Sequence, residues 1–239
     1  MILKKADPKD DALAALNALL ATAPQAKHKL IEQEIRIIKA GQHAENEAAY
    51  HLDFALAASK VTAVIHDLRI VLHDGRTAQI DHLVIHRTNK FYVLETKSFS
   101  HGVKITKDGE FLRWNDFKRR YEGLPSPLEQ NERHVTVLTR LLASAEWPEP
   151  VIKPYVMISP KAKVIRPDEN EFDTSRVVKA DQFISTLQTD LEQTGLISGL
   201  LGMARMRSVE DIGRWLCGCH KPAKPTDYAA KFGLEQKTA

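Results

Sequence analysis

The apolar positions recur at helical spacing up to about Leu56. In residues 8–22 they predict a short amphipathic helix, which Pro24 ends. The mixed stretch 27–39 predicts a second helical piece that leads to Gly41, and residues 42–56 predict a third helix with one apolar face. That face consists of Ala44, Ala48, Ala49, Leu52, Ala55 and Leu56.

The spacing then changes to that of strands. Short runs rich in β-branched residues are apolar or alternate between apolar and polar, and they cover residues 61–65, 68–72, 78–85 and 91–94. Asp74-Gly75 and Thr88-Asn89 supply turn residues between them, which predicts a meander of strands. Because a short turn joins the last two runs, we expect those two to pair antiparallel.

Beyond the meander the chain returns to helices. Ser126-Pro127-Leu128-Glu129 is typical of a helix start, with Ser at the N-cap, Pro at the first position and Glu completing a capping box. Residues 155–159 predict one more strand, which Pro160 ends, and helical segments are expected near 181–193 and 207–217. This order of elements predicts an α/β fold with a central mixed β-sheet flanked by helices.

Composition changes this picture little. The chain has 239 residues, 43% apolar and 27% charged, as in an ordinary soluble globular protein, and its net charge of +3 is too small to identify a nucleic-acid partner. The apolar run 12–23 is too short to span a bilayer and follows acidic residues where a secretory signal requires basic ones. Cys217 and Cys219 are too close in sequence for a normal structural disulfide. We therefore expect a cytoplasmic protein with no membrane association.

Charged residues on two of the predicted strands fall on a common face. Glu95 and Lys97 are two residues apart, so alternation places them on the same side of their strand. Gln79 and Asp81 share a side of the preceding strand for the same reason. With the two strands antiparallel, Asp81 lies close to Glu95. The pattern predicts two carboxylates and an ammonium at one end of a sheet.

Glu45 adds a third acid from the preceding helix, at helical spacing from Ala49 and Leu52. A carboxylate that faces a sheet is costly to bury unless a cation meets it, and Mg²⁺ binds two or three carboxylates while keeping several waters. Such a metal would activate a water, while Lys97 would orient that water or neutralise charge on a phosphodiester. Taken singly, Glu95 with Lys97 could be a solvated strand face and Glu45 a surface acid. Their order along the chain favours a site.

Three segments resemble the signature motifs of the NERD (nuclease-related domain) family, which is placed in the PD-(D/E)XK nuclease superfamily. They are Gly41-Gln-His-Ala-Glu45, Gln79-Ile-Asp-His82 and Val93-Leu-Glu-Thr-Lys97. Pro127-Leu-Glu-Gln130, with His134 one turn later, resembles the family's next helix. The resemblance covers approximately residues 39–145. Ala44 and Ser98 stand where Gly and Asn are frequent in the family, and neither departure removes a catalytic group.

The resemblance implies a restriction-endonuclease-like core and a nuclease that depends on Mg²⁺ or Mn²⁺. By resemblance, the metal would be bound by Glu45, Asp81 and Glu95. Lys97 would be the catalytic lysine, and Gln130 would be a helix residue that faces the site.

We divide the chain into three parts: an N-terminal helical extension (1–38), the nuclease-like domain (39–160), and a mostly helical C-terminal extension (161–239) that completes the core or packs on it. Cys217-Gly-Cys-His220 in the last part has the residue types of a zinc site. A zinc site commonly needs two such pairs, so this single cluster favours a helix end with buried thiols.

The segment that begins at the candidate lysine, residues 97–121, contains seven basic residues and three acids, a net charge of +4. Trp114, Phe117 and Tyr121 are interleaved with the cations, a mixture that suits base stacking and phosphate contacts. The candidate nucleic-acid contacts are Gln79, Lys104, Arg113, Trp114, Lys118, Arg119 and Arg120. The alternative is an ordinary polar hairpin and loop whose aromatic residues anchor it to the core.

Three functions stay open on the sequence. The favoured one is a metal-dependent nuclease that hydrolyses phosphodiester bonds of nucleic acid, with DNA as the expected substrate. The second is a non-catalytic DNA-binding or accessory module that retains the nuclease fold. The third is an interaction protein in which residues 161–239 form a docking platform. The sequence leaves open whether the protein works as a homodimer or with a DNA-processing partner protein.

Overall fold

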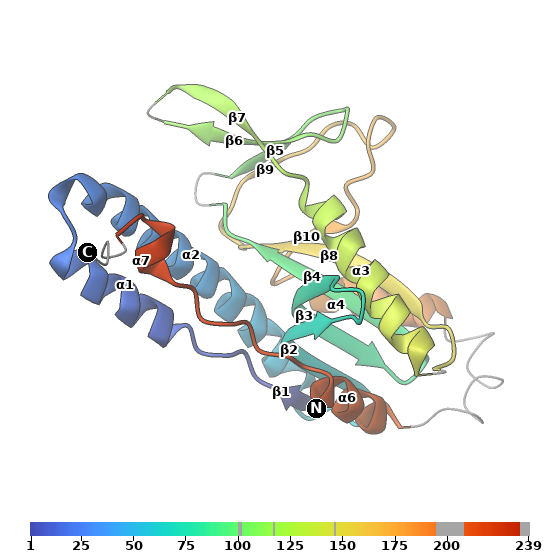
Figure 1. The fold of residues 1–239 in the computed structure, drawn as a ribbon. Coiled ribbons are helices and arrows are strands. Elements are labelled where there is room, and N and C mark those ends of the chain that lie inside the picture. The colour runs from blue at the N-terminus through green and yellow to red at the C-terminus, as the bar shows by residue number, and fades with distance from the viewer. Residues whose placement is uncertain (100–101, 117, 146, 195–207, 235–239) are drawn as a thin grey trace.

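A six-stranded sheet forms the centre of the protein (Figure 1). The computed structural model describes residues 1–99, 102–116, 118–145, 147–194 and 208–234. The strands lie in the order β1 (Ile2–Lys4), β2 (Thr62–Val71), β3 (Thr77–His86), β4 (Lys90–Lys97), β8 (Val151–Ile158) and β10 (Val177–Lys179). β2, β3 and β4 pair antiparallel, as predicted for the meander, whereas β1, β8 and β10 join in parallel. The sheet is therefore mixed.

Helices cover both faces of this sheet. α2 (Gln25–Leu56) and α4 (Phe183–Thr194) pack on one face, where Leu52 and Tyr92 are fully buried. α3 (Pro127–Ser144) and α6 (Val209–Gly218) pack on the other face. These layers confirm the predicted α/β fold with a central mixed sheet flanked by helices, which is compatible with a restriction-endonuclease-like core.

α2 is a single helix of 32 residues, so the predicted break at Gly41 between two helical pieces is wrong. An isolated glycine lowers helix stability by only about 1 kcal/mol, which tertiary packing can offset. The C-terminal half of α2 packs on the sheet, and the predicted boundary after residue 38 falls inside the helix. Despite its length, neither α2 nor any other described helix combines the length and apolar character needed to cross a membrane.

The N-terminal half of α2 extends beyond the sheet and has a small core of its own. α1 (Asp10–Thr22) and the short α7 (Tyr228–Lys231) pack against it, with Leu16, Ile31 and Ile35 buried between them. We call α1, this half of α2 and α7 the helical arm. The arm places α1, from the start of the chain, beside α7, from its last described part (Figure 1).

β2 is one strand where the sequence predicts two, over 61–65 and 68–72. Asp67 interrupts the alternation with a positive φ of 53°. Ile65 and Leu68 are three residues apart, yet both lie in the core cluster on the α3 side. Ile80 and Leu83 on β3 show the same shift. In both adjacent strands, the side of the sheet to which alternate residues point is therefore reversed at the same level, just beside Asp81.

A second, smaller sheet of four strands follows the central one, in the order β7 (Arg120–Leu124), β6 (Phe111–Asn115), β5 (Val103–Ile105) and β9 (Val164–Ile165). Its inner face packs on the N-terminus of α3 and on β8 through Val103, Ile105 and Phe111. β6 and β7 form the hairpin that the sequence suggests as the alternative to a nucleic-acid contact. Trp114 and Tyr121 do not anchor it, because they are 36% and 42% exposed, whereas Phe111 is buried on the inner face.

The described residues after 160 contribute to every layer of the molecule. β10 extends the central sheet and β9 the smaller one, while α4 and α6 cover opposite faces. Lys221 N–H donates to the Arg69 carbonyl, and α7 closes the helical arm. This part of the chain therefore completes the cores of the protein.

Candidate active site

The candidate site lies where β3 and β4 separate. The two strands pair from His86 opposite Lys90 to His82 opposite Leu94, and the next positions are Asp81 and Glu95. There the carboxylate of Asp81 replaces a strand partner, because its Oδ2 accepts the backbone N–H of Thr96 at 2.7 Å. Separation of the strands thus leaves room for two acidic side chains at the level where the ladder ends.

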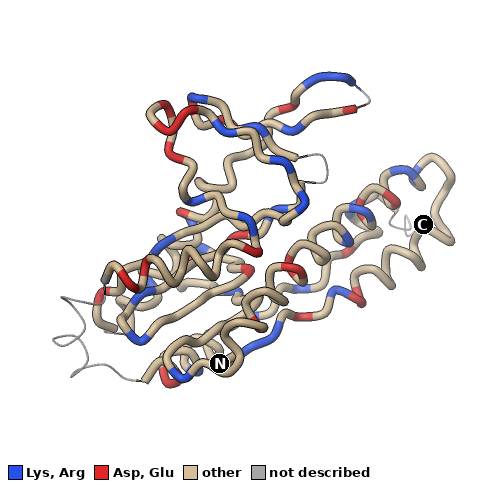
Figure 2. Tube along the Cα trace, turned by 180° about the vertical axis from the view of Figure 1, so that it is seen from behind, with Lys and Arg blue, Asp and Glu red and all other residues tan. Residues whose placement is uncertain are grey.

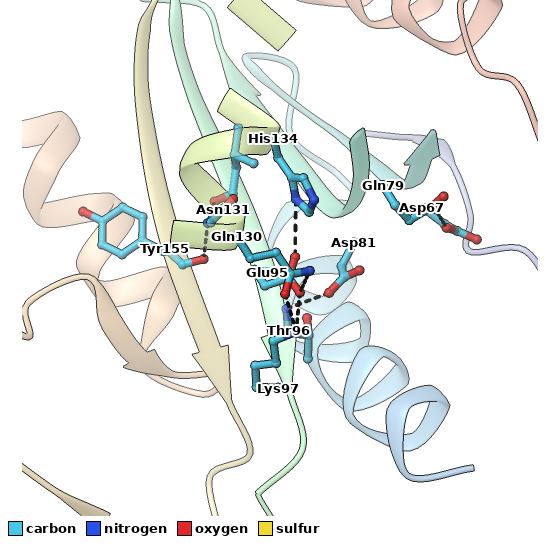
Figure 3. Close-up of polar contacts among 11 residues, drawn as sticks. Asp67, Gln79, Asp81, Glu95, Thr96, Lys97, Gln130, Asn131, His134 and Tyr155 are labelled. Atoms are coloured by element: carbon cyan, nitrogen blue, oxygen red, sulfur yellow. Dashed lines mark hydrogen bonds and ion pairs between the residues drawn. The ribbon is translucent and has the colours of Figure 1, made fainter. Parts of the chain in front are cut away.

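Glu95 is the centre of a compact polar group, although its side chain is only 4% exposed. Its Oε1 accepts from Lys97 Nζ and from Gln130 Nε2, both at 2.7 Å. Lys97 Nζ also donates to Gln130 Oε1 at 2.9 Å. The three side chains close a ring of hydrogen bonds beside Asp81 (Figure 3).

α3 places Gln130 in this ring. The helix begins where predicted, with Pro127 in its first turn and the Ser126 side chain accepting from Glu129 N–H at 3.3 Å, but the Glu129 side chain makes no bond back to Ser126 that would complete the predicted capping box. Asn131, fully buried, donates its amide hydrogens to the carbonyls of Val93 and Tyr155, both at 2.9 Å. These bonds fix α3 over β4 and β8, beside Pro154, which has no N–H to give to the ladder.

Burial and mutual repulsion raise the pKa values of both carboxyl groups. Desolvation is the largest cause for Asp81, and the charges of Glu95 and Glu45 add to it, against the Thr96 N–H and Lys97. Desolvation is also the largest cause for Glu95, where Lys97 opposes the rise and Glu45 adds to it. A cation near both carboxylates would stabilise their ionised forms.

His134 lies one turn along α3 from Gln130. Its Nδ1 is 3.4 Å from Glu95 Oε2, without the geometry of a hydrogen bond. Burial, reinforced by Lys97 and Arg133, lowers the pKa of His134 to about 4. The ring is therefore neutral near pH 7.

Glu45, on α2, is close enough for its charge to act on Asp81 and Glu95, but its own carboxylate is occupied. Lys9, just before α1, places its Nζ 2.6 Å from both Oε1 and Oε2 of Glu45. The pair is half-buried, with 33% of the Lys9 side chain and 20% of the Glu45 side chain exposed. The ammonium group of Lys9, from the N-terminal segment, thus already pairs with the carboxylate of Glu45, the third acid.

The donor set suits a hard divalent cation. Glu95 Oε2 is buried with no hydrogen-bond partner, and Asp81 lies beside it. Mg²⁺ takes oxygen ligands and usually needs only one or two carboxylates, because it keeps several waters. As the side chains stand, no three His, Cys, Asp or Glu residues within the described ranges form a group that could hold a metal ion. Asp81 and Glu95 therefore fit such an ion, and Glu45 would join them only by leaving Lys9.

The candidate nucleic-acid contacts lie elsewhere. Gln79 bonds to Asp67 and points away from the acidic group (Figure 3), so the structure does not bring it to Asp81. The other candidates are on the smaller sheet or in its β6–β7 turn, and Phe117 lies outside the described residues. Arg113 and Lys118 pair with Glu122 at 3.7 and 2.8 Å. None of these residues contacts the acidic group through a described bond.

Two further groups have structural partners. His82 is buried, with Nδ1 2.7 Å from Nδ1 of His66, on the side of the sheet away from α3. His220 Nδ1 accepts the Arg69 backbone N–H at 3.1 Å. Cys217 and Cys219 are free thiols, and their partial burial raises both pKa values.

Lys9 and Asn131 are the site residues that the sequence did not indicate. Asn131 had a signal, since a polar residue next to Gln130 on the apolar face of a helix suggests a buried hydrogen-bonding role. Lys9 had none, because 36 residues separate it from Glu45 and only the packing of α1 on α2 brings the two together.

Comparison with protein families gives one match. The family described as "Nuclease-related domain" (NERD) matches residues 40–159, about half of the chain. No match was found among curated proteins or among solved structures. The matched segment contains Glu45 and all members of the hydrogen-bonded ring, and it ends just after β8.

Proposed function

Because the chain belongs to the nuclease-related domain family, we propose that it is a metal-dependent nuclease that hydrolyses phosphodiester bonds of nucleic acid, with DNA as its substrate. The observation that carries the proposal is the group of Asp81, Glu95 and Lys97 at the divergence of β3 and β4. The buried Glu95 and the half-buried Asp81, both with raised pKa values and beside a lysine, are unfavourable for stability, which is typical of functional sites.

Asp81 and Glu95 would hold Mg²⁺ or Mn²⁺, with Glu45 as a third ligand once it is released from Lys9. When bound, the metal would activate a water and neutralise charge on the phosphate. Gln130 keeps the Lys97 ammonium beside Glu95, from which Lys97 can donate to a phosphate oxygen or to the attacking water. His134, neutral near pH 7, can accept a proton from a water next to Glu95.

A second function is favoured by one observation. The contact of Lys9 with Glu45 leaves fewer than three acids available together, as expected for a binding module that retains the fold without cutting. Such a module would bind DNA equally well with and without a divalent metal. We rank it below the nuclease because Asp81, Glu95 and Lys97 are all present.

A cleavage assay separates the two functions. Purified protein is incubated with supercoiled plasmid, linear duplex, single-stranded DNA and RNA, in Mg²⁺, Mn²⁺ or EDTA. We expect metal-dependent cleavage that falls by about 100-fold or more in Asp81→Asn and in Lys97→Ala. Asp108→Asn and Lys60→Ala are matched controls, since both residues are exposed and remote from the acidic group.

Cleavage that is equally fast in the two site variants would show a contaminating enzyme. If no substrate is cut with either metal while DNA still binds, the non-catalytic function replaces the nuclease.

A further inference from the structure

The smaller sheet has an outer face whose residues can be identified from strand pairing. Residues directly opposite each other in a sheet point to the same side. Lys104 is opposite Leu112 and Ile165, and Trp114 is opposite Tyr121. All five lie on the side away from the buried Val103, Ile105 and Phe111. We call this surface the outer face.

The outer face is apolar at its centre and exposed. Trp114 and Tyr121 form a perpendicular pair with ring centroids 5.2 Å apart. Ile165 is 38% exposed beside them. Gly123 lies opposite Leu112 on the same side, and a side chain added there would meet only open space. The face thus offers aromatic surface next to an unfilled position.

Its charge is positive. Lys104 Nζ lies 5.3 Å from the centre of the Tyr121 ring, and Lys163 joins Lys104, Trp114 and Tyr121 around a shallow hollow. Arg119 adds charge at the tip of the β6–β7 hairpin, where Figure 2 shows a basic run projecting from the body of the protein, whereas Arg120, opposite Asn115, lies on the other side of the sheet. No acidic residue occupies the outer-face strand positions, since Glu122 is paired with Arg113 on the other side. The complementary ligand is an anion with flat apolar parts.

We propose that the outer face binds an unpaired strand of nucleic acid, which makes the substrate of the proposed nuclease one with a single-stranded segment. Bases stack on Trp114 and Tyr121, and phosphates contact Lys104 and Lys163. A duplex does not fit this surface as well, because its base faces are hidden within the helical stack. Sequence-independent single-strand sites combine aromatic platforms with cations in this way.

The outer face is connected to the candidate active site by a short piece of chain. β4 carries Glu95 and Lys97 and leads directly to β5, so the path from Lys97 to Lys104 spans at most about 25 Å. Gly102, with a φ of 83°, allows this connection to pass close to Lys163, whose carbonyl accepts from Val103 N–H at 2.8 Å. A strand bound at Lys104 is thereby held within about 25 Å of Lys97.

Binding measured in EDTA, where cleavage is absent, tests the proposal. The full chain is titrated into fluorescent oligo(dT) and into a blunt duplex of the same length, and anisotropy is recorded. The wild type is expected to bind the single strand more tightly. The Trp114→Ala/Tyr121→Ala variant should bind it about 10- to 100-fold more weakly, with duplex binding little changed. Phe54→Ala is the control, because Phe54 is an 84% exposed aromatic residue on α2.

Gly123→Glu and Gly123→Lys form a second pair that leaves the aromatic residues intact. Neither side chain meets an obstacle, so both variants should fold, with unchanged thermal unfolding. Glu is expected to weaken single-strand binding and Lys to preserve it, since they differ in charge on the outer face. Oligo(rU) replaces oligo(dT) in a parallel titration, and dependence of either ligand on the same residues supports the proposal.

The proposal is overturned if Trp114→Ala/Tyr121→Ala binds oligo(dT) as the wild type does, or loses single strand and duplex equally. These titrations are carried out in EDTA and do not depend on cleavage. Their failure would overturn the role of the outer face alone, whereas absence of cleavage in the assay described above would overturn the proposed nuclease alone.

Discussion

Asp81 is a residue whose ionisation the fold disfavours. Burial and the neighbouring charges of Glu95 and Glu45 raise its pKa above the unfolded value of about 3.9. The folded state therefore binds the proton more tightly than the unfolded state. Stability from this group is fully present below the unfolded pKa and is lost as pH rises through the folded pKa.

Asp81→Asn should consequently stabilise the metal-free protein while abolishing cleavage. The Asn carbonyl oxygen can still accept the Thr96 N–H, and no charge remains to be buried. We expect a gain of about 0.5–2 kcal/mol in the free energy of unfolding at pH 7. The gain should shrink as pH is lowered toward 4, measured by urea unfolding in EDTA. Asp108→Asn, in an exposed turn, should show no such change. A less stable Asp81→Asn protein at pH 7 would contradict this assignment.

Lys9 supplies the cation that Glu45 otherwise lacks in the metal-free protein. Lys9→Met should lower the free energy of unfolding in EDTA by about 1–2 kcal/mol, because a half-buried charged pair is broken. It should also tighten Mn²⁺ binding in calorimetry, since the metal no longer competes with an ammonium. Lys5→Met, at an exposed position nearby, is the control. Unchanged Mn²⁺ affinity in Lys9→Met would exclude Glu45 as a ligand.

At the scale of single residues, the sequence predicts the position of a side chain correctly where the strand alternates regularly. Glu95 and Lys97 are two apart on β4, where alternation is undisturbed, and they do meet at 2.7 Å. Gln79 and Asp81 do not lie on the same side of the sheet. The backbone irregularity at Asp67 reverses the side to which alternate residues of β2 and β3 point. From the sequence, the break in alternation between Ile65 and Leu68 predicts a gap between two strands, and not a change of side within one strand, so the position of Gln79 does not follow from it.

Among the elements, α3 connects the site to the sheet. Asn131 is bonded to β4 and β8 at once, and Gln130 and His134 depend on the position that it fixes. Asn131→Leu leaves two carbonyls without their donor, which should lower the free energy of unfolding by about 1–3 kcal/mol.

The same variant should reduce kcat, although Asn131 bonds to backbone carbonyls and not to the proposed metal ligands, because Gln130 no longer keeps Lys97 beside Glu95. Urea unfolding and single-turnover cleavage measure the two effects. Thr136→Ala, exposed on the same helix, controls for changes in helix propensity. A kcat equal to that of the wild type, in a protein of reduced stability, would restrict Asn131 to a purely structural role.

The start of α3 could be predicted because a local signal specifies it: Ser126 and Pro127 act through neighbouring backbone groups. The small sheet could be predicted only in part. Its strands β5 and β9, like β10 of the central sheet, have two or three residues each, too few for a periodic pattern, and they form because neighbouring strands lie beside them. Long-range pairing of this kind has no local sequence signature.

The whole molecule has separate cores, and the helical arm should behave as an independent unit. Ile31 is fully buried between α1, α2 and α7, away from the central sheet. Ile31→Ala should lower the local stability of the arm by about 2–4 kcal/mol. Hydrogen exchange should then be faster throughout α1, α7 and the first half of α2, and unchanged in β3 and β4.

Leu83→Ala, in the core cluster of the central sheet, is the matching substitution and should accelerate exchange throughout the protein. If Ile31→Ala accelerates exchange in β3 and β4 as strongly as in α1, arm and sheet form a single cooperative unit.

β4 also has a consequence for synthesis on the ribosome. A short turn joins it to β3, with which it pairs. Its other edge stays unpaired until β8 is synthesised, and β8 begins more than fifty residues after β4 ends. During that interval the nascent chain presents Phe91 to Leu94, later fully buried, along an open strand edge. Parallel pairing across so long a connection is slow. A chain interrupted in this interval should aggregate, and slowing translation there should lower the yield of folded protein unless a chaperone covers the edge.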